Sequence, residues 1–264
     1  MGVLFLSDID GTLVDSHDVP VNVKKAIKEF TIQGNWFSLA TGRNAFAIRW
    51  LVDELVINAP CIILTGAALY DSKKDALWNI KPLPEQCKKA LRLLHEGYPT
   101  MGIQVFTRSG LCNLRLNSFL QEHGIPEEIA CSVSDIQSLE NQEILKIGLC
   151  CEDVKKIELA TKELFSDKLQ YKWHYSHVIG AEVFSPMASK GIALKALIES
   201  MPEIPDLVAV AGDSPNDLSM FEHADVTFAP ETAFPEVREA ADYIIPSPKE
   251  GGVAQAINIL MNKI

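Results

Sequence analysis

Two aspartates stand one residue apart at the end of an apolar run near the start of the chain. In the segment "VLFLSDIDGTLV", Asp8 and Asp10 follow residues 3–6, and Gly11 comes directly after them. Like charges at this separation repel, and without a counterion one of the two carboxyl groups would take up a proton. The pair therefore predicts a site that recruits a positive charge.

A second acidic loop follows another apolar run. In "GDSPND", Asp213 and Asp217 come after residues 207–211. In an open α/β sheet, ligands bind outside the carboxyl ends of the parallel strands, so we expect both acidic loops on one rim. Oxygen ligands with few carboxylates suit a hard divalent cation, above all Mg²⁺. The two loops together predict a magnesium site.

The spacing of Asp8 and Asp10 suits phosphoryl transfer. Residues i and i+2 at a strand end project to the same side but lie apart, so one carboxylate can attack phosphorus while the other reaches the leaving oxygen. We expect Asp8 to be the nucleophile that forms an aspartyl-phosphate. Asp10 would protonate the departing alcohol and then deprotonate the hydrolytic water.

Short apolar runs without alternation predict the strands that position these loops. They are typical of strands buried on both faces of a parallel sheet, and helical periods such as Val23, Ile27 and Phe30 separate them. We therefore expect a doubly wound, Rossmann-like α/β core. The runs occupy residues 3–6, 36–40, 61–64, 207–211, 226–229 and 243–245.

The middle of the chain has a different pattern. Residues 102–117 and 169–185 alternate between apolar and polar side chains, and residues 84–97 and 152–165 have helical periods. Antiparallel strands with helices on one face fit this pattern. We expect a discontinuous α/β core, residues 1–74 and 186–264, with an α+β cap domain, residues 75–185, inserted into it.

Composition excludes several classes of partner. The net charge is −11, which disfavours binding to nucleic acid or to an anionic membrane. No stretch has the length of a membrane span, and the six cysteines lack CxxC spacing, as in a reduced cytoplasmic protein. We expect a cytoplasmic protein that acts on a small molecule, and no feature of the sequence indicates an oligomeric state.

Four motifs in order resemble those of the haloacid dehalogenase superfamily. They are "DIDGTL" from Asp8, "ATGR" with Thr41, "SKG" with Lys190 and "GDSPND" from Gly212, and they span nearly the whole chain. Only about thirty residues separate the first two motifs, and the large insert follows the second. This arrangement resembles the Cof-type, class IIB branch, whose members are mostly Mg²⁺-dependent phosphatases of sugar phosphates and similar metabolites.

The resemblance implies a role for each motif residue. Asp8 would be the nucleophile and a metal ligand, Asp10 the acid/base and a ligand through its carbonyl, and Asp213 a further ligand. Asp217 would hold a metal-bound water or orient Lys190. The residues implied to bind the phosphate are Ile9, Thr41, Gly42, Lys190 and Asn216.

Two positions depart from the usual pattern of the family. Thr65 precedes Gly66 where relatives usually have Asn-Gly, and Thr232 stands where they tend to have Asn. Both replace an amide with a hydroxyl near the rim and put the usual sugar-phosphate preference in question. Arg43 is expected to bind a second anion of the substrate or to form a salt bridge, and Thr65 and Glu182 are candidate substrate contacts.

These features predict a Mg²⁺-dependent phosphatase of a small phosphorylated metabolite, in which the insert closes as a cap and selects the leaving group. A phosphomutase is a near alternative, because the first half-reaction is the same. A non-catalytic phospho-acceptor is another, since such sensors also combine an acidic pocket, a hydroxyl and a lysine around Mg²⁺. Asp10 and the large insert favour the enzyme.

Overall fold

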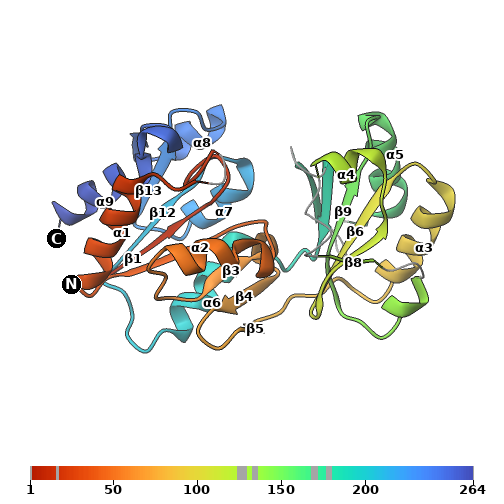
Figure 1. The fold of residues 1–264 in the computed structure, drawn as a ribbon, viewed down its shortest axis with the longest axis horizontal. Coiled ribbons are helices and arrows are strands. Elements are labelled where there is room, and N and C mark those ends of the chain that lie inside the picture. The colour runs from red at the N-terminus through yellow and green to blue at the C-terminus, as the bar shows by residue number, and fades with distance from the viewer. Residues whose placement is uncertain are drawn as a thin grey trace. The chain divides into compact units, whose positions relative to one another are not determined.

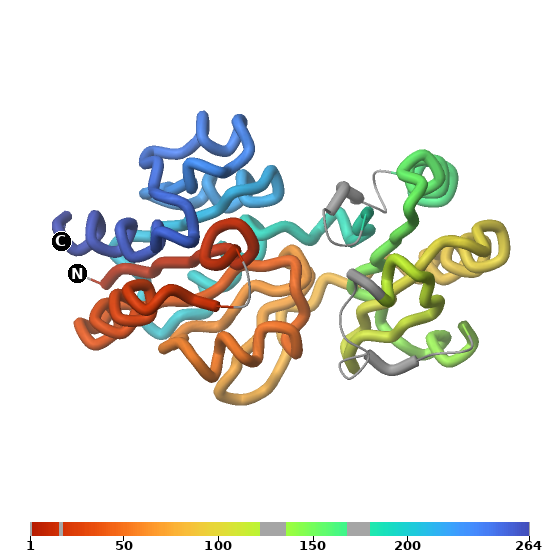
Figure 2. The backbone as a smooth tube through the Cα atoms, turned by 45° about the horizontal axis from the view of Figure 1, so that its top comes forward, coloured from red at the N-terminus to blue at the C-terminus, as the bar shows by residue number. Residues whose placement is uncertain are grey.

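A computed structural model describes residues 2–15, 18–123, 130–132, 136–167, 172–176 and 180–263. The chain forms two compact units, residues 1–79 with 189–264 and residues 80–188. Figure 2 shows that the first unit is built from both ends of the chain, and that the N- and C-termini lie near each other in it. Residues 169–171 and 177–179 of the predicted strand segment 169–185 lie outside the described residues.

A five-stranded parallel sheet forms the centre of the first unit (Figure 1). Ser7 at the end of the first strand pairs with Leu39 on one side and Ala211 on the other, so three strands end at the same level. The predicted parallel core is therefore confirmed. The strands, in sheet order, are β14 (Tyr243–Ile245), β13 (Val226–Pro230), β12 (Leu207–Ala211), β1 (Val3–Ser7) and β2 (Trp36–Leu39).

Helices cover both faces of this sheet because β1 is apolar on both sides. On one face, Leu4 of β1 packs in a buried cluster with Leu194 of α6 (Lys190–Ser200) and Met220 of α7 (Leu218–Phe221). On the other face, the ring of Phe5 contacts Phe30 of α1 (Val21–Ile32) edge-on at 6.4 Å. Helix α1 in turn packs beside α9 (Gly252–Met261). The shorter helices α2 (Arg49–Glu54) and α8 (Pro235–Ala240) complete this unit within the described residues.

The prediction that residues 61–64 form a further full strand of the parallel sheet is wrong. Strand β3 (Cys61–Ile63) joins that sheet through a single parallel bridge, between Ala40 and Ile62. Its ladder pairing is antiparallel, with β4 (Ala68–Asp71), which pairs in turn with β5 (Ala76–Trp78). Positive φ angles in the turn at residues 64–66 reverse the chain immediately after β3, so it forms a hairpin and no crossover follows.

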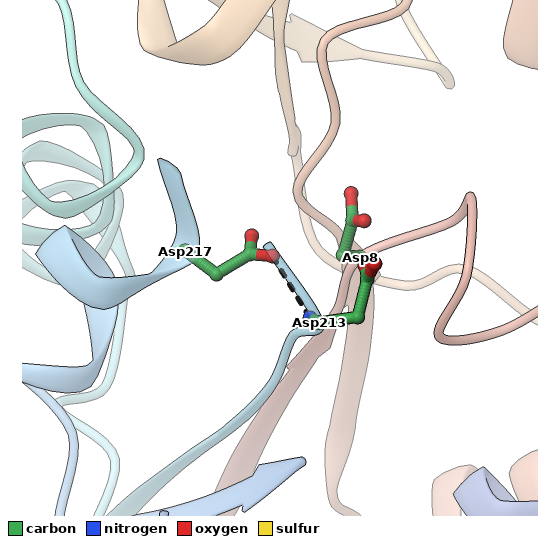
Figure 3. Close-up of side chains that lie close together, drawn as sticks. All are labelled: Asp8, Asp213 and Asp217. Atoms are coloured by element: carbon green, nitrogen blue, oxygen red, sulfur yellow. Dashed lines mark hydrogen bonds between the residues drawn. The ribbon is translucent and has the colours of Figure 1, made fainter. Parts of the chain in front are cut away.

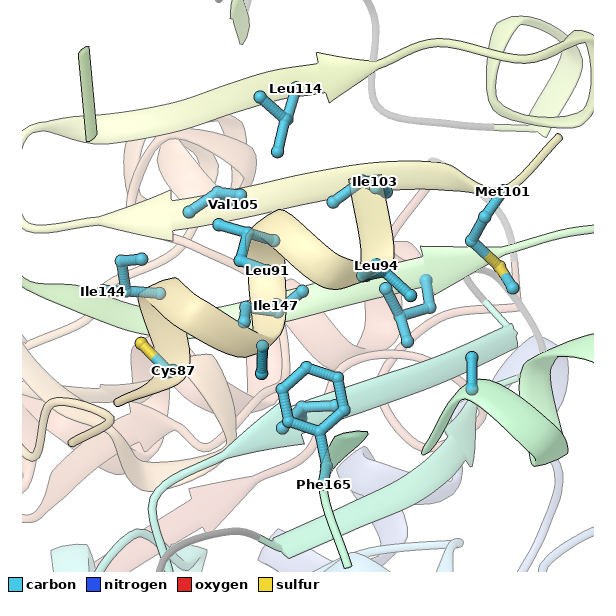
Figure 4. Packing of buried hydrophobic residues seen from close by; sticks show 14 of the residues in the cluster. Cys87, Leu91, Leu94, Met101, Ile103, Val105, Leu114, Ile144, Ile147 and Phe165 are labelled. Carbon is cyan, nitrogen blue, oxygen red and sulfur yellow. The ribbon is translucent and has the colours of Figure 1, made fainter. Parts of the chain in front are cut away.

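The second unit has a six-stranded sheet, and the helices α3 (Cys87–Gly97) and α5 (Val154–Leu164) pack against one of its faces. Helix α3 buries Cys87, Leu91 and Leu94, which lie at the i, i+4, i+7 spacing of one helical face. Figure 4 shows these side chains against Ile103 and Ile147 of the sheet. Burial of each such leucine contributes about 1.5–3 kcal/mol to stability. The predicted α+β character of the insert is therefore observed.

The strands of this sheet are, in order, β10 (Lys172–Ser176), β11 (Gly180–Phe184), β9 (Ile144–Cys150), β6 (Gly102–Thr107), β7 (Gly110–Arg115) and β8 (Ala130–Ser132). All neighbours pair antiparallel except β7 and β8, which are parallel. The other α-helix described in this unit is α4 (Ser118–His123). In neither unit does a described helix have the length and apolar character needed to span a membrane.

Candidate active site

Three carboxylates converge at the carboxyl ends of β1 and β12. One oxygen from each of Asp8, Asp213 and Asp217 lies within 4.8 Å of the others (Figure 3). The backbone N–H of Asp8 donates to the carbonyl of Ala211 at 2.9 Å, which extends the β1–β12 ladder into the two acidic loops. Asp8 and Asp217 are buried, and Asp213 is half-buried. The structure thus brings together the two acidic loops, as predicted.

Gly11 allows the two acidic loops to approach each other. Its φ of +83° is in the left-handed region, and a Cβ at this position would lie 2.5 Å from Oδ2 of Asp213. The next residue, Thr12, donates from Oγ1 to Oδ1 of Asp213 at 3.1 Å. Sequence reasoning missed Thr12 as a site residue, although it directly follows Gly11 within the "DIDGTL" motif.

The loop after β12 holds the carboxylate of Asp217 with its own backbone. Both Asp213 and Ser214 donate their backbone N–H groups to Oδ2 of Asp217, each at 3.0 Å. The pattern is a capping box around the short 3₁₀ helix Pro215–Asp217. Asn216, a predicted phosphate ligand, lies in the same turn and accepts from Oγ of Ser214 at 2.8 Å. Asp217 is therefore oriented by its own loop.

Lys190 supplies the positive charge of the cluster. Its Nζ lies 2.8 Å from Oδ1 of Asp8 and 2.5 Å from Oδ1 of Asp217, and its side chain is 1% exposed. Ser189 caps the start of α6 by accepting from the backbone N–H of Ile192 at 3.1 Å, which places Lys190 at the first helical position. The predicted lysine thus bridges the acidic loops.

The cluster carries an excess of negative charge. Three carboxylates and one ammonium group leave two negative charges in excess when all four groups are ionised. Burial raises the pKa of Asp8 well above its ordinary value; Lys190 opposes this rise, and Asp217 and Asp213 add to it. Burial and the neighbouring Asp217 raise the pKa of Asp213 to about 6. An all-oxygen donor set with this excess charge fits a divalent cation.

The ammonium group of Lys190 is held in its charged form. Burial alone would lower its pKa, but the charges of Asp217 and Asp8 outweigh burial and raise that pKa above its ordinary value. A fixed positive charge beside a carboxylate is suited to binding phosphate oxygens.

Asp10 lies outside this carboxylate cluster. Arg43 donates from Nε to Oδ2 of Asp10 at 2.9 Å and from its terminal nitrogen to Oδ1 at 2.6 Å. Of the two roles expected for Arg43, the structure thus has a salt bridge, and its partner is Asp10. The Asp10 side chain is 53% exposed, in contrast to Asp8 at 8%. The two aspartates of the motif therefore have different surroundings.

The loops after β2 and β3 lie against the start of α6. Thr41 is buried, and its carbonyl accepts from the backbone N–H of Thr65 at 3.0 Å. A Cβ on Gly66 would lie 2.1 Å from the carbonyl oxygen of Ser189, the residue before Lys190. Backbone packing thus brings together Thr41, Thr65 and Lys190. Gly42 lies between Thr41 and Arg43 in the chain.

Thr65 occupies a conformation that is unusual for its residue type. Its φ and ψ are +57° and +30°, and a β-branched residue in this region is strained. Asn is several-fold enriched there, so the usual family residue would suit this backbone better. The departure noted in the sequence thus coincides with backbone strain next to Thr41.

Three other residues singled out in the sequence have different surroundings. Ile9 is buried, and its carbonyl accepts from the N–H groups of residues 12–14, which closes the turn after β1. Glu182 lies in the second unit, where it is buried and its Oε1 is 2.6 Å from Nζ of Lys146. Thr232 is exposed, in the loop before α8.

Comparison with known proteins agrees with the geometry. The family of haloacid dehalogenase-like hydrolases matches residues 5–257. The 5-amino-6-(5-phospho-D-ribitylamino)uracil phosphatase YwtE of Bacillus subtilis is 28% identical over 285 residues, covering 97% of this chain and 96% of the relative.

Solved structures share the fold over nearly the whole chain. A haloacid dehalogenase-like hydrolase from Bacteroides thetaiotaomicron has a TM-score of 0.84 at 24% identity, covering 97% of this chain and 98% of the other. A HAD subclass IIB sugar phosphatase has a TM-score of 0.81 at 20% identity, covering 98% and 99%. The chain therefore belongs to the haloacid dehalogenase-like hydrolases and is a phosphatase with the class IIB form of that fold, as its four motifs predicted.

Proposed function

We propose that this phosphatase is Mg²⁺-dependent and hydrolyses a small phosphorylated metabolite through a phosphorylated Asp8. The observation that carries the proposal is the buried carboxylate of Asp8 between a fixed cation and two further carboxylates, with Oδ1 hydrogen-bonded to Lys190 at 2.8 Å. Buried Lys190 fixes the position of Asp8, and positioning together with charge neutralisation is the main need of phosphoryl transfer.

In the first step, a carboxylate oxygen of Asp8 attacks phosphorus and the bond from phosphorus to the substrate oxygen breaks. Asp10 gives a proton to the departing alkoxide, so the product leaves as an alcohol. Lys190, the N–H groups of Ile9 and Gly42, the hydroxyl of Thr41 and the amide of Asn216 bind the phosphate oxygens.

In the second step, Asp10 takes a proton from a water molecule, whose oxygen then bonds to phosphorus. The bond between Asp8 and phosphorus breaks, and inorganic phosphate is released with Asp8 restored. Arg43 donates to both oxygens of Asp10, so it has to release one of them before Asp10 can hold the proton that it donates in the first step.

Mg²⁺ would be held by Asp8, Asp213, the carbonyl of Asp10 and, through water, Asp217, and would neutralise charge on the carboxylates and on the transferring phosphoryl group. The excess negative charge of the cluster supports this assignment. Because the cluster contains only oxygen donors, Mg²⁺ suits it better than a soft metal ion.

The second unit is proposed to act as a cap that selects the leaving group, in an enzyme of the cytoplasm. Free thiols at Cys61, Cys87, Cys112, Cys150 and Cys151 are consistent with a reducing compartment. Since a relative is named for 5-amino-6-(5-phospho-D-ribitylamino)uracil and a structural neighbour is described as a sugar phosphatase, phosphorylated sugars, polyols and their pyrimidine conjugates are the first substrates to test.

The test is release of inorganic phosphate from a panel of sugar, polyol, nucleotide and cofactor phosphates, with and without Mg²⁺, beside an Asp8→Asn variant. We expect Mg²⁺-dependent release that falls at least about 10³-fold in the variant, whose circular dichroism should match that of the parent. Activity retained by the variant would contradict the nucleophile. Net transfer of phosphate to another hydroxyl would indicate a mutase, and a stable phospho-Asp8 without turnover would indicate a sensor.

A further inference from the structure

The start of helix α6 is held on one side by the turn at residues 64–66. Gly66 has a φ of +89°, and a Cβ at this position would lie 2.1 Å from the carbonyl oxygen of Ser189 and 2.9 Å from the backbone nitrogen of Lys190. No side chain fits into contacts of this length, so only glycine allows the turn to lie this close to α6. The turn and the first residues of α6 are therefore in direct backbone contact.

Helix α7 holds the start of α6 on the other side. The backbone N–H of Gly191 donates to Oγ of Ser219 at 3.1 Å, and this hydroxyl donates to the carbonyl of Asn216 at 3.2 Å. A Cβ on Gly191 would lie 1.9 Å from the carbonyl oxygen of Ser219, so here too the two backbones are in contact. The N–H groups of a first helical turn have no partner within the helix, and Ser219 satisfies one of them from outside.

Lys190 lies between these two contacts. We call them together the α6 clamp: Gly66 against Ser189 on one side, and Gly191 against Ser219 on the other. Since residues 189–191 are consecutive, the clamp fixes the residues directly before and after Lys190. The four-carbon side chain of lysine is flexible by itself. A fixed place for its ammonium group therefore requires a fixed backbone.

The clamp also ties Lys190 to two other loops of the site. On one side, the N–H of Thr65, in the same turn as the clamp glycine, donates to the carbonyl of Thr41 at 3.0 Å. On the other side, Ser219 reaches the carbonyl of Asn216. Thr41, Lys190 and Asn216 are side chains proposed above to bind the phosphate. The clamp thus links three phosphate-binding groups that come from distant parts of the chain.

We propose that Gly66 and Ser219 are positioning residues, which place Lys190 for contact with the phosphoryl group by fixing the start of α6. Both act through the helix that carries the lysine. A displacement of about 1 Å in a catalytic group can reduce turnover about 10²-fold. The inference rests on the proposed function, in which Lys190 binds phosphate oxygens. It predicts defects in phosphate binding and turnover at temperatures where the variants are fully folded.

Gly66→Ala tests one side of the clamp, with Gly34→Ala as a matched control. The two glycines have φ angles of +89° and +90°, but a Cβ on Gly34 would meet nothing within 4 Å. Both variants therefore strain the backbone to a similar degree, and only Gly66→Ala pushes against α6. At a temperature well below the Tm of both, we expect kcat to fall at least about tenfold in Gly66→Ala and to change less than about twofold in Gly34→Ala.

Ser219→Ala tests the other side, with Ser200→Ala as its control. Ser200 lies at the opposite end of α6, where its Oγ donates to the carbonyl of Leu197 at 2.7 Å. Each variant removes one hydroxyl that contacts α6, but only Ser219→Ala releases the start of the helix. The readout besides turnover is the Kd of inorganic phosphate with Mg²⁺ present, measured by titration calorimetry. We expect this Kd to rise at least about fivefold in Ser219→Ala and in Gly66→Ala, and less than about twofold in both controls.

Two results would overturn the inference: a kcat in Gly66→Ala equal to that in Gly34→Ala, or an unchanged Kd for phosphate in folded Ser219→Ala. If Gly66→Ala does not fold, by circular dichroism, the comparison of Ser219→Ala with Ser200→Ala decides. Failure of the proposed function would look different, because the parent protein itself would then release no phosphate in a Mg²⁺-dependent and Asp8-dependent manner.

Discussion

The buried acidic cluster of the first unit and the buried Lys146–Glu182 ion pair of the second unit differ in net charge. In the first, Asp8, Asp213, Asp217 and Lys190 bond to one another and to the backbone, yet carry excess charge. In the second, Lys146 and Glu182 cancel in charge. One chain thus keeps excess negative charge in one buried group of side chains and none in the other.

The largest effect in this comparison is expected for Lys190→Met. It would leave three close carboxylates without their cation, and removing one partner of a buried ion pair costs about 3–5 kcal/mol. We expect that loss in the free energy of unfolding without Mg²⁺, a smaller loss with Mg²⁺, and loss of turnover. Urea unfolding with and without Mg²⁺ measures this difference. Lys195→Met, an exposed lysine of the same helix, is the control, and an equal loss in both variants would contradict the assigned role.

The ion pair of the second unit should respond differently to removal of one partner or of both. Lys146→Met alone removes an ionic partner of buried Glu182 and should lower the free energy of unfolding by about 3–5 kcal/mol. Lys146→Met with Glu182→Leu removes both charges and should recover most of that loss, since an apolar pair of similar volume is often neutral. Urea unfolding tests this. Mg²⁺ should change the loss of free energy of unfolding in neither the single nor the double variant. A double variant as unstable as the single one would show that the pair is needed for more than mutual neutralisation.

The close approach of the two acidic loops can be tested by adding one carbon atom. Gly11 and Gly34 have similar φ angles, +83° and +90°, but a Cβ on Gly34 would meet nothing within 4 Å. Gly34→Ala should therefore cost only the left-handed conformation, about 1–2 kcal/mol. Gly11→Ala should cost more and also reduce turnover, because its Cβ would displace Asp213. Thermal unfolding and phosphate release compare the two, and equal losses of stability with full activity would contradict the assigned close contact.

The smallest effect is a dependence of stability on pH. The pKa of Asp213 is raised from 3.8 to about 6 in the folded protein. Between these values the folded state keeps a proton that the unfolded chain has lost, so rising pH favours unfolding. The stability from this group is complete below about pH 4 and lost as pH passes about 6. Without Mg²⁺ we expect Tm to fall by a few degrees over this range.

A bound cation reverses this trend because it prefers the ionised carboxylates. The stabilisation by Mg²⁺, measured as the rise in Tm at fixed concentration, should therefore increase between about pH 4 and 6. An Asp213→Asn variant, which cannot titrate at this position, should show a weaker dependence. A rise in Tm that is the same at both ends of the range in the parent protein would contradict the cation site.

Several features of the site were predictable because they follow from strand order and side-chain type. Asp8 and Asp213 end neighbouring parallel strands, so any doubly wound fold of these strands brings them to one rim. The hairpin at β3 was not predictable in the same way. The apolar segment "CIIL" is compatible with parallel or antiparallel pairing, and the strained turn at Thr65 that follows it has no clear sequence signal.

Sequence alone determined the family, the order of the strands along the chain and the residue types available for chemistry, since these depend on local patterns and on motif spacing. Tertiary structure alone decided which groups pair. Lys190 bridges Asp8 and Asp217, Arg43 takes Asp10, and Ser219 accepts from Gly191. The physical reason is that a hydrogen bond or ion pair depends on distances of a few ångströms between residues far apart in the chain, and only packing sets those distances.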